Sequence, residues 1–549
     1  MRRDETGLRD AEVNLRFLRG QQHPQAEGPA SPFRPDASTY RFTLNVMNQL
    51  VKRKTALITD SRPQIDIMAF SKNRRGTAAV FKQTISALWD EANFDQSATR
   101  ELVRAAVIGS TACVPMWNDK AKYGKGTIDF LMFDPRQVML DPTVTRAIDV
   151  QRSAQFAGVK EVLSLNAIRE NWPSNGPRVK GSLKWSSYAS AATSRTRWQG
   201  IATAMQRPWR RAEELTQSAS PRNEVMHTWF RDWPRDKQGT PVYTSPMFVR
   251  YVAQSDGVVL KDEPTVPHHG QIPIHLLDWD IELEHPWGIS EVGGLRRIQY
   301  TLNRMMAQVV ENILLTNRVK VVADADAVDQ ATWASIANNP NGIFIRKRQG
   351  RTLAYDTPQG AVPGYVVQII QLLLQGVDIV SGMTEVTRGV APKGNTSGIA
   401  IEGLQIAAQS IIRLEARAFE NWLERIFQQV ISLIWQYFTS DRLLYLVGPN
   451  KMYEEYLFDR AKLLVDDEQG KLPDDGWKDF TFKVLPGSSL AMTRVQKGVL
   501  ASNLYQLGLI PGIEVLRAAE YPNPEEMVKQ AREDAAQGLG PGGARNVAA

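Results

Sequence analysis

Residues 288–316 read GISEVGGLRRIQYTLNRMMAQVVENILLT. Their apolar side chains recur every three or four positions, which is the spacing of one face of an α-helix. At 1.5 Å per residue, a helix over this stretch is about 42 Å long, and a helix of that length usually bridges two parts of a molecule. The residues of the stripe are Ile289, Val292, Leu295, Ile298, Leu302, Met305, Val309 and Ile313.

Two further helices are predicted downstream of this one. Residues 363–382 have helical spacing and one charged side chain, Asp378. Residues 398–438 predict a helix of about 60 Å, and the loop between the two contains glycine and proline. A small α/β unit is predicted ahead of the second helix, from strand-like runs at 319–323, 343–346 and 352–355 and a helical run at 328–337.

The rest of the chain mixes both kinds of pattern, so the predicted fold class is α+β with several domains. The chain has 549 residues, which is three or four domains' worth at about 150 residues each. Helical stretches are 42–58, 78–108 and short runs within 493–537, and strand-like runs are 112–117, 127–133, 225–233, 246–254, 257–260, 443–446 and 480–484.

Composition excludes several classes of protein. Hydrophobic residues make up 43% and charged residues 23%, which is ordinary for a globular protein. The net charge of +7 is too small for this length to identify a nucleic-acid binder. The most apolar stretch, residues 365–374, is interrupted by Gln368 and Gln371, so no membrane-spanning helix is expected. The first ten residues, MRRDETGLRD, lack a signal-peptide core, so we expect a protein that is intracellular when made.

Residues 389–396, GVAPKGNT, come one residue short of the phosphate-binding pattern G-x-x-x-x-G-K-[ST]. Asn395 stands where a lysine would neutralise phosphate charge, and the loop follows a predicted helix rather than a strand. No G-x-S-x-G elbow for a nucleophile is present. The sequence therefore predicts no catalytic residue and no cofactor.

A metal site is not predicted either. The stretch 268–285 contains four histidines and four carboxylates, but no pair of them has a recognised ligand spacing. We expect these side chains to be solvated or hydrogen-bonded within the fold. Cys113, the one cysteine, has no partner for a metal or redox motif and is expected to be a small buried residue. The candidates set aside are His268, His269, His275, His285, Asp278, Asp280, Glu282 and Glu284.

Residues 171–212 carry eight basic side chains, four tryptophans and no acidic residue. Basic side chains with aromatic ones between them can neutralise and stack on nucleic acid. An insertion that packs its tryptophans on the parent domain explains the same composition, and both interpretations stay open.

Several passages together resemble the portal proteins of tailed bacteriophages, most closely those of short-tailed phages. The resemblance covers about residues 10 to 530 and depends on the order of weak motifs rather than on one strong motif. The passages are NVMNQLVKRKTALITDSRPQIDIMA (45–69), ELVRAAVIGSTACVPMWND (101–119), DPRQVMLDPTV (134–144), HPWGISEVGGLRRIQYTLNRMMAQVVENILLTN (285–317) and GMTEVTRGVAPKGNTSGIAIEGLQ (382–405).

The resemblance implies a subunit with wing, long-helix stem, small α/β clip and helical crown. Segment 171–212 matches no portal element, and the C-terminus is too short for the helical barrel of some portals. By order along the chain, the parts are a flexible lead-in (1–39), wing (40–287 and 398–490), stem helices (288–317 and 362–383), clip (318–361), tunnel loop (384–397), crown (491–537) and flexible tail (538–549).

The resemblance also implies a ring, usually of twelve identical subunits, at the unique capsid vertex of the virion. Double-stranded DNA passes through such a ring during packaging and ejection. The implied partners are the terminase large subunit, a tail adaptor protein, the major capsid protein and the scaffold, with assembly in the host cytoplasm and no membrane.

Three sets of residues are candidates for this function. A channel must screen phosphate without gripping it, and the second stem helix has a nearly uncharged polar stripe at i, i+3, i+7 and i+10. By resemblance, the tunnel loop contacts DNA and the clip docks the motor and adaptors. The residues are Gln368, Gln371, Gln375 and Asp378 in the stripe, Arg388, Lys393, Asn395 and Thr396 in the loop, and Arg346, Lys347, Arg348 and Arg351 in the clip.

Two other classes compete with a portal. A phage structural or ejected head protein that forms no ring would share much of this pattern. A packaging ATPase would need a complete phosphate loop and a carboxylate-bearing metal site, and residues 389–396 do not provide the first.

Overall fold

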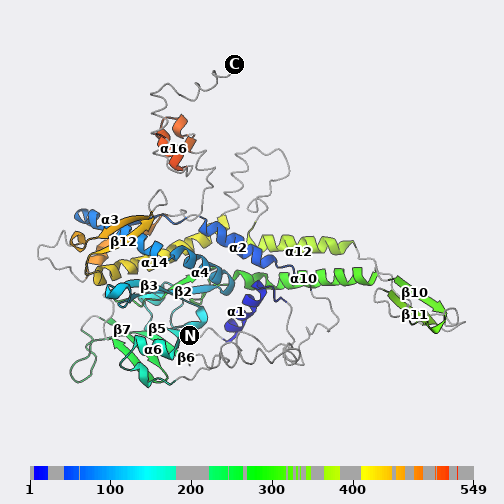
Figure 1. Ribbon diagram of the computed structural model, residues 1–549, viewed down its shortest axis with the longest axis horizontal. Coiled ribbons are helices and arrows are strands. Elements are labelled where there is room, and N and C mark those ends of the chain that lie inside the picture. Colours follow the sequence, from blue (N-terminus) through cyan, green and yellow to red (C-terminus); the bar gives the residue numbers. More distant parts are fainter. Residues whose placement is uncertain are drawn as a thin grey trace, which may run out of the picture. The chain divides into compact units, whose positions relative to one another are not determined.

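The computed structural model shows a mixed helix and sheet protein, as predicted (Figure 1). Its contacts divide the chain into two compact units. Unit 1 comprises Met1–Leu8, Lys54–Ile289 and Ile412–Ala549, and unit 2 comprises Arg9–Arg53 and Ser290–Ile411. The residues that the structure describes are 5–22, 42–60, 62–180, 222–244, 247–263, 269–316, 319–324, 329–331, 334, 342–347, 364–383, 410–447, 453–463, 475–485, 501–502, 504–518 and 528.

Unit 1 combines helices with four antiparallel sheets. The helices are α3 (Arg75–Glu91), α4 (Phe94–Ile108), α5 (Asp149–Arg152), α6 (Leu165–Asn171), α14 (Ser410–Tyr437) and α16 (Gly512–Ala518). The strands are β1 (Ile65–Ala69), β2 (Ser110–Asn118), β3 (Thr127–Phe133), β4 (Val138–Leu140), β5 (Phe156–Ser164), β6 (Arg222–Asp232), β7 (Phe248–Ser255), β8 (Val258–Glu263), β9 (His275–Asp278), β12 (Arg442–Val447), β13 (Tyr453–Phe458) and β14 (Phe480–Val484).

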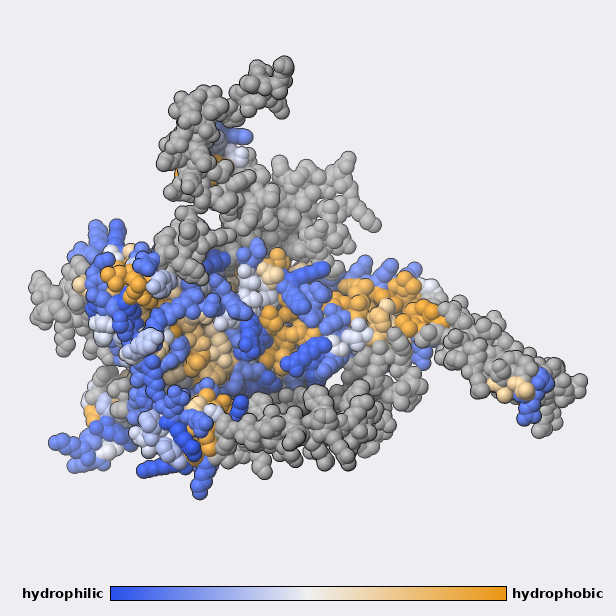
Figure 2. All heavy atoms as spheres, viewed as in Figure 1, coloured by the Kyte–Doolittle hydropathy of each residue, from blue (hydrophilic) through white to orange (hydrophobic). Residues whose placement is uncertain are grey.

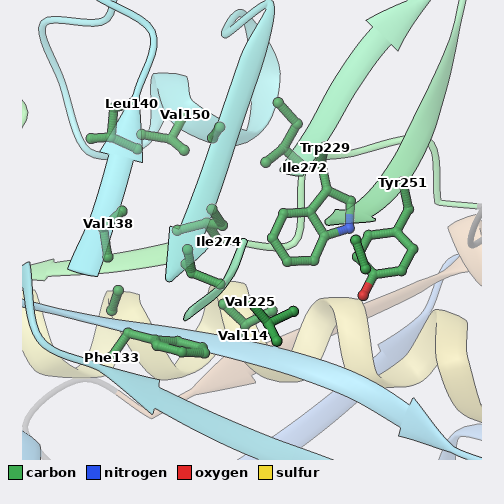
Figure 3. Packing of buried hydrophobic residues seen from close by; sticks show 14 of the residues in the cluster. Val114, Phe133, Val138, Leu140, Val150, Val225, Trp229, Tyr251, Ile272 and Ile274 are labelled. Atoms are coloured by element: carbon green, nitrogen blue, oxygen red, sulfur yellow. The ribbon is translucent and has the colours of Figure 1, made fainter. Parts of the chain in front are cut away.

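The largest sheet has the order β4-β5-β6-β7-β8, and a three-stranded sheet has the order β3-β2-β9. The other two sheets are the pairs β1-β14 and β12-β13. A continuous apolar core lies between the first two sheets, with Trp229 and Tyr251 beside Val225 and Val114 (Figure 3). Alternate residues of a strand point to one face, so the apolar residues of each strand gather there.

Helix α14 is the centre of the remaining core of unit 1. Trp422, Phe427 and Ile434 are fully buried, and Phe427 stacks on Trp89 of α3 at a centroid distance of 5.0 Å. Aromatic pairs at such distances add to the stabilisation that comes from burying their area.

Polar side chains of α14 form hydrogen bonds with backbone groups of β14 and β9. Gln428 accepts a hydrogen bond from Phe482 N (2.8 Å) and donates one to Phe480 O (2.9 Å). Trp422 Nε1 donates to His275 O (3.0 Å), and Arg425 Nη2 donates to Leu276 O (2.6 Å). Because buried backbone groups without partners cost free energy, these contacts fix the helix against β14 and β9.

Unit 2 contains most of α1 (Glu5–Leu18), the first part of α2 (Val46–Thr59), and the long helices α10 (Glu291–Thr316) and α12 (Tyr365–Ser381). Helices α10 and α12 lie side by side (Figure 1). Strands β10 (Val319–Asp324) and β11 (Gly342–Lys347) form a parallel pair. The connection between parallel strands needs a crossover, which agrees with the predicted strand-helix-strand order.

A buried network of amides holds the N-terminal part of unit 2 on α10. Asn303 Nδ2 donates to Gln22 Oε1 (2.6 Å), and Gln299 Nε2 donates to Leu44 O (2.6 Å). Asn14 is also buried and donates to Ser290 Oγ (3.1 Å). Residues 10–22 therefore pack against α10, whereas 23–41 lie outside the described residues.

Most predicted elements are present, with different ends. The stretch 78–108 is two helices, because Asn93 adopts a left-handed conformation (φ 46°) between α3 and α4. Strands β1, β4, β5, β9 and β13 lie outside the strand-like runs expected from the sequence. Cys113 is fully buried on β2, as expected, and burial raises the pKa of its thiol. Among the described helices, none is both long and apolar enough to cross a membrane.

Candidate channel and docking surfaces

Helix α12 presents three different faces. Its buried side chains, Val377 and Ser381, and the half-buried Val366 and Ile370 lie on one side, beside α10. At about 100° per residue, the glutamines form a second face and a row of exposed apolar residues forms a third, each roughly 120° from the next. A helix that is apolar on two sides but buried on only one is expected to contact a further molecule through its exposed apolar side.

The exposed apolar face is large. Leu372 is 66% exposed, Ile379 is 79% exposed and Tyr365 is 62% exposed. Figure 2 shows hydrophobic residues gathered over α10 and α12. Soluble monomers rarely leave a contiguous apolar surface of this kind uncovered, so it marks an interaction site.

The predicted polar stripe lies on the second face. Gln368, Gln371 and Gln375 are exposed, whereas Asp378 is half-buried. Helix α12 ends directly after this stripe, where Gly382 takes a left-handed conformation (φ 68°) and its N–H bonds to the Asp378 carbonyl. The stripe is thus uncharged over its exposed length.

Two of the four predicted clip residues lie at one end of the parallel strand pair. Arg346 and Lys347 are the last two residues of β11, opposite Ala323 and Asp324 of β10. Arg348 and Arg351 lie outside the described residues, as does the predicted strand 352–355. The tunnel loop also lies outside them, including Arg388, Lys393, Asn395 and Thr396.

The model for the family Phage P22-like portal protein matches residues 1–471. The chain belongs to this portal family. No curated protein gives a significant match. Portal proteins are structural head-tail connectors of phages that serve DNA packaging, and they are not enzymes.

His269 and His275 of the stretch 268–285 are hydrogen-bonded within the fold, as expected for this portal protein. His275 is buried between Gln151 and Gln429, which contact its two ring nitrogens, and burial lowers its pKa to about 3. Gln429 Nε2 also contacts His269 Nε2 (2.8 Å). His285 is exposed, and His268 lies outside the described residues. Among the described residues, no group of three or more His, Cys, Asp or Glu side chains is arranged for a metal.

The basic segment of this portal protein is described only at its start. Trp172 follows α6 and lies beside His227, with ring centroids 6.1 Å apart. Residues 181–212 lie outside the described residues, so its other tryptophans and most of its basic side chains do too.

Periodicity alone does not reveal the exposed apolar face of α12. Spacing shows that a helix has an apolar side, but it does not show how many apolar sides the helix has. The available signal was the composition of 365–381, in which Asp378 is the only charged residue. A helix that is apolar nearly all round needs partners on more than one side.

Proposed function

We propose that this chain forms the closed portal ring of a tailed phage, through which double-stranded DNA enters the capsid and leaves it. The observation that carries the proposal is the exposed apolar face of α12 beside its glutamine stripe. In a closed ring each subunit contacts two neighbours through different surfaces. The apolar face then packs on a neighbour while the stripe faces the central channel.

A size measurement tests the ring. Light scattering and negative-stain images of the purified chain should give a centrally perforated particle, of twelve subunits if the common stoichiometry of portals holds. A chain that stays monomeric across protein and salt concentrations would contradict the proposal. An irregular assembly would instead favour a head protein that forms no ring.

The glutamine stripe suits a channel for DNA. Each tight contact to a phosphate adds affinity that translocation has to break. Gln368, Gln371 and Gln375 offer polar groups without charge, so they keep the channel hydrated and let the duplex slide.

We assign motor and adaptor docking to the clip, residues 318–361. Arg346, Lys347, Arg348 and Arg351 place four basic side chains within six positions, a surface suited to an acidic partner. The partners are the terminase large subunit during packaging and a tail adaptor afterwards. Arg346→Glu with Arg348→Glu should weaken capture of the terminase large subunit in a pull-down and leave the ring intact.

The matched control reverses two charges where β10 begins, Lys320→Glu in the strand and Arg318→Glu, which precedes the strand in the sequence. Docking at the basic end predicts that only the first pair of substitutions weakens capture. Equal capture by both variants and the parent would remove the assignment.

We assign DNA contact within the channel to the tunnel loop, residues 384–397. Arg388 and Lys393 place two positive charges per subunit beside a polyanion, and Asn395 and Thr396 add polar groups. Fourteen residues is longer than the roughly two to eight of most helix-helix connections. Arg388→Ala with Lys393→Ala should leave assembly normal and reduce the DNA retained in filled heads.

The control for this test is Arg413→Ala with Arg417→Ala, which removes two exposed charges from α14. If both variants retain full-length DNA equally well, the loop is only a connection.

By family resemblance, we propose that unit 1 supplies the wing that contacts the major capsid protein and scaffold. Assembly then takes place in the host cytoplasm, and the finished ring lies at the capsid vertex.

A further inference from the structure

Unit 1 contains a cavity of about 600 Å³, whose lining includes none of the candidate channel, loop or clip residues. Its walls are the five-stranded sheet, the hairpin of β2 and β3, the start of the segment after α6, and the end of α14. This volume is within the range of about 300–1,000 Å³ that is typical of ligand sites.

The strand register places four ionisable side chains on the same face of the five-stranded sheet. Glu161 of β5 is opposite Val225, two residues before His227 on β6. Tyr251 of β7 is opposite both Trp229 and Glu263 of β8. Glu161, His227, Tyr251 and Glu263 all line the cavity.

His227 has an unused hydrogen-bonding position at this cavity. The side chain is 7% exposed, and its Nδ1 is 2.7 Å from the Tyr251 hydroxyl. Burial raises the pKa of Tyr251, so the phenol stays protonated. With this phenol as donor to Nδ1, the neutral ring carries its proton on Nε2.

No hydrogen bond to Nε2 is made by any residue that the structure describes. Glu161 Oε2 is 3.4 Å away without hydrogen-bonding geometry. A buried polar atom without a partner costs free energy, so Nε2 is a position where a ligand atom that accepts a hydrogen bond would be stabilised.

The charge of the cavity favours a cation. Its walls carry four carboxylates and two lysines, although the whole chain has a net charge of +7. The Lys261–Glu263 ion pair (2.5 Å) neutralises one of these carboxylates, and Lys120 Nζ donates to Glu170 O (2.6 Å). The walls therefore keep an excess of two negative charges. The carboxylates are Asp119, Asp129, Glu161 and Glu263.

Aromatic rings supply flat apolar surface beside these carboxylates. Trp117 stacks on Tyr437 with a centroid distance of 5.0 Å and an interplanar angle of 7°. Trp172 and Trp229 also line the cavity. Tryptophan faces attract cations, and a planar guanidinium stacks on them better than an ammonium does.

We propose that this cavity binds an arginine side chain carried by a peptide segment of a partner protein. The guanidinium pairs with Glu161, its aliphatic stem lies against the tryptophans, and a backbone carbonyl of the peptide accepts the hydrogen bond from His227 Nε2. A free ammonium leaves most of the volume and the Nε2 donor unused. DNA is disfavoured, because its phosphates would meet the carboxylates. The proposal does not depend on ring formation.

The test measures binding of acetyl-Gly-Arg-Gly-amide to the full chain by saturation-transfer NMR. Three probes serve for comparison: the same peptide with citrulline, which keeps the shape but has no charge, the same peptide with lysine, and spermidine. We expect saturable binding of the arginine peptide, with transfer to its side-chain methylenes, and weaker binding of all three comparison probes.

Glu161→Gln should lower the affinity for the arginine peptide by about tenfold or more, because a hydrogen bond to a charged group is lost. The matched control is Glu224→Gln, on the opposite face of the neighbouring strand β6, which should bind as the parent does. Thermal unfolding of both variants separates loss of binding from loss of folding.

Three results would overturn the proposal. These are equal binding of the citrulline and arginine peptides, tighter binding of spermidine than of the arginine peptide, and equal affinities of a folded Glu161→Gln variant and the parent. The second result would reassign the cavity to polyamines.

Discussion

Helices α14 and α12 are both long and rich in apolar residues, but they bury them in different ways. Trp422, Phe427 and Ile434 of α14 are completely buried within unit 1. On α12 only Val377 and Ser381 are buried, while Leu372 and Ile379 are mostly exposed. The same kind of apolar pattern therefore forms part of the protein core in α14 and an exposed apolar surface in α12.

The difference shows where each helix gains its stabilisation. Burying apolar area contributes roughly 25 cal/mol per Å². Helix α14 gains this within its own subunit, together with the hydrogen bonds from Gln428 and Arg425 to strand edges. Helix α12 gains most of it only when another chain covers Leu372 and Ile379. Substitutions in α14 should therefore act on folding, and those on the outer faces of α12 on assembly.

The largest effect is expected for Trp422→Ala. The indole is fully buried, packs on Phe419 and donates to His275 O. Removing it leaves a cavity and an unpaired carbonyl, so the free energy of unfolding should fall by about 3–5 kcal/mol. Urea unfolding followed by circular dichroism measures this. Leu372→Ala is the control and should change the value by less than about 0.5 kcal/mol; similar losses for both would contradict the comparison.

A smaller effect, dependent on pH, is expected at Asp278, where β9 meets α14. Burial raises the pKa of this carboxyl from 3.8 to about 7, against the opposing effect of Arg425. Between these values the unfolded chain ionises Asp278 while the folded chain keeps it protonated. The folded state then binds more protons, so this group's contribution to stability is lost as the pH rises from about 4 to 7.

Asp278→Asn removes this titration and keeps an oxygen that can accept from Ser110 Oγ. The difference in unfolding free energy between the variant and the parent should grow with pH, by up to about 1.4 kcal/mol per pH unit in that window. His275, whose pKa is lowered, has the opposite pH dependence in both proteins, so it cancels in the difference. A difference that is constant from pH 4.5 to 7.5 would show that Asp278 does not titrate as described.

The sequence predicted what local spacing determines. Helices α10 and α12, strands β10 and β11, and the polar stripe at Gln368, Gln371 and Gln375 follow from periodicity. The order of the motifs predicted the portal family, which the family match confirms. The assignments to wing, stem, clip and crown, and of the candidate site residues, stay predictions.

The sequence did not predict features that depend on distant contacts. Strand β1 pairs with β14, more than four hundred residues away, with Ile65 opposite Val484, and no local pattern in IDIMA separates it from a loop. The amides Gln22, Gln299 and Asn303 look like surface residues until the fold joins them. Periodicity also does not distinguish an apolar face that packs internally from one that binds another subunit.

The smallest effect on the folded subunit, and the sharpest test of the comparison, is expected for two adjacent residues of α12. Leu372→Lys and Gln371→Lys add the same charge one position apart, about 100° around the helix. Leu372 is 66% exposed and Gln371 is also exposed, so neither should change the stability of the isolated subunit by more than about 0.5 kcal/mol.

Their effects on assembly should differ. A lysine at Leu372 puts a charge into the proposed contact with a neighbouring subunit, where burial without a partner is costly, so native mass spectrometry should detect subunits and few rings. A lysine at Gln371 keeps its charge in a water-filled channel, so rings should form. Those rings should hold DNA more tightly and package it more slowly, because each subunit adds a phosphate contact that salt weakens. If Gln371→Lys abolishes rings and Leu372→Lys does not, the glutamine face is the subunit contact and the apolar face lines the channel. That outcome would reverse the proposed orientation of α12.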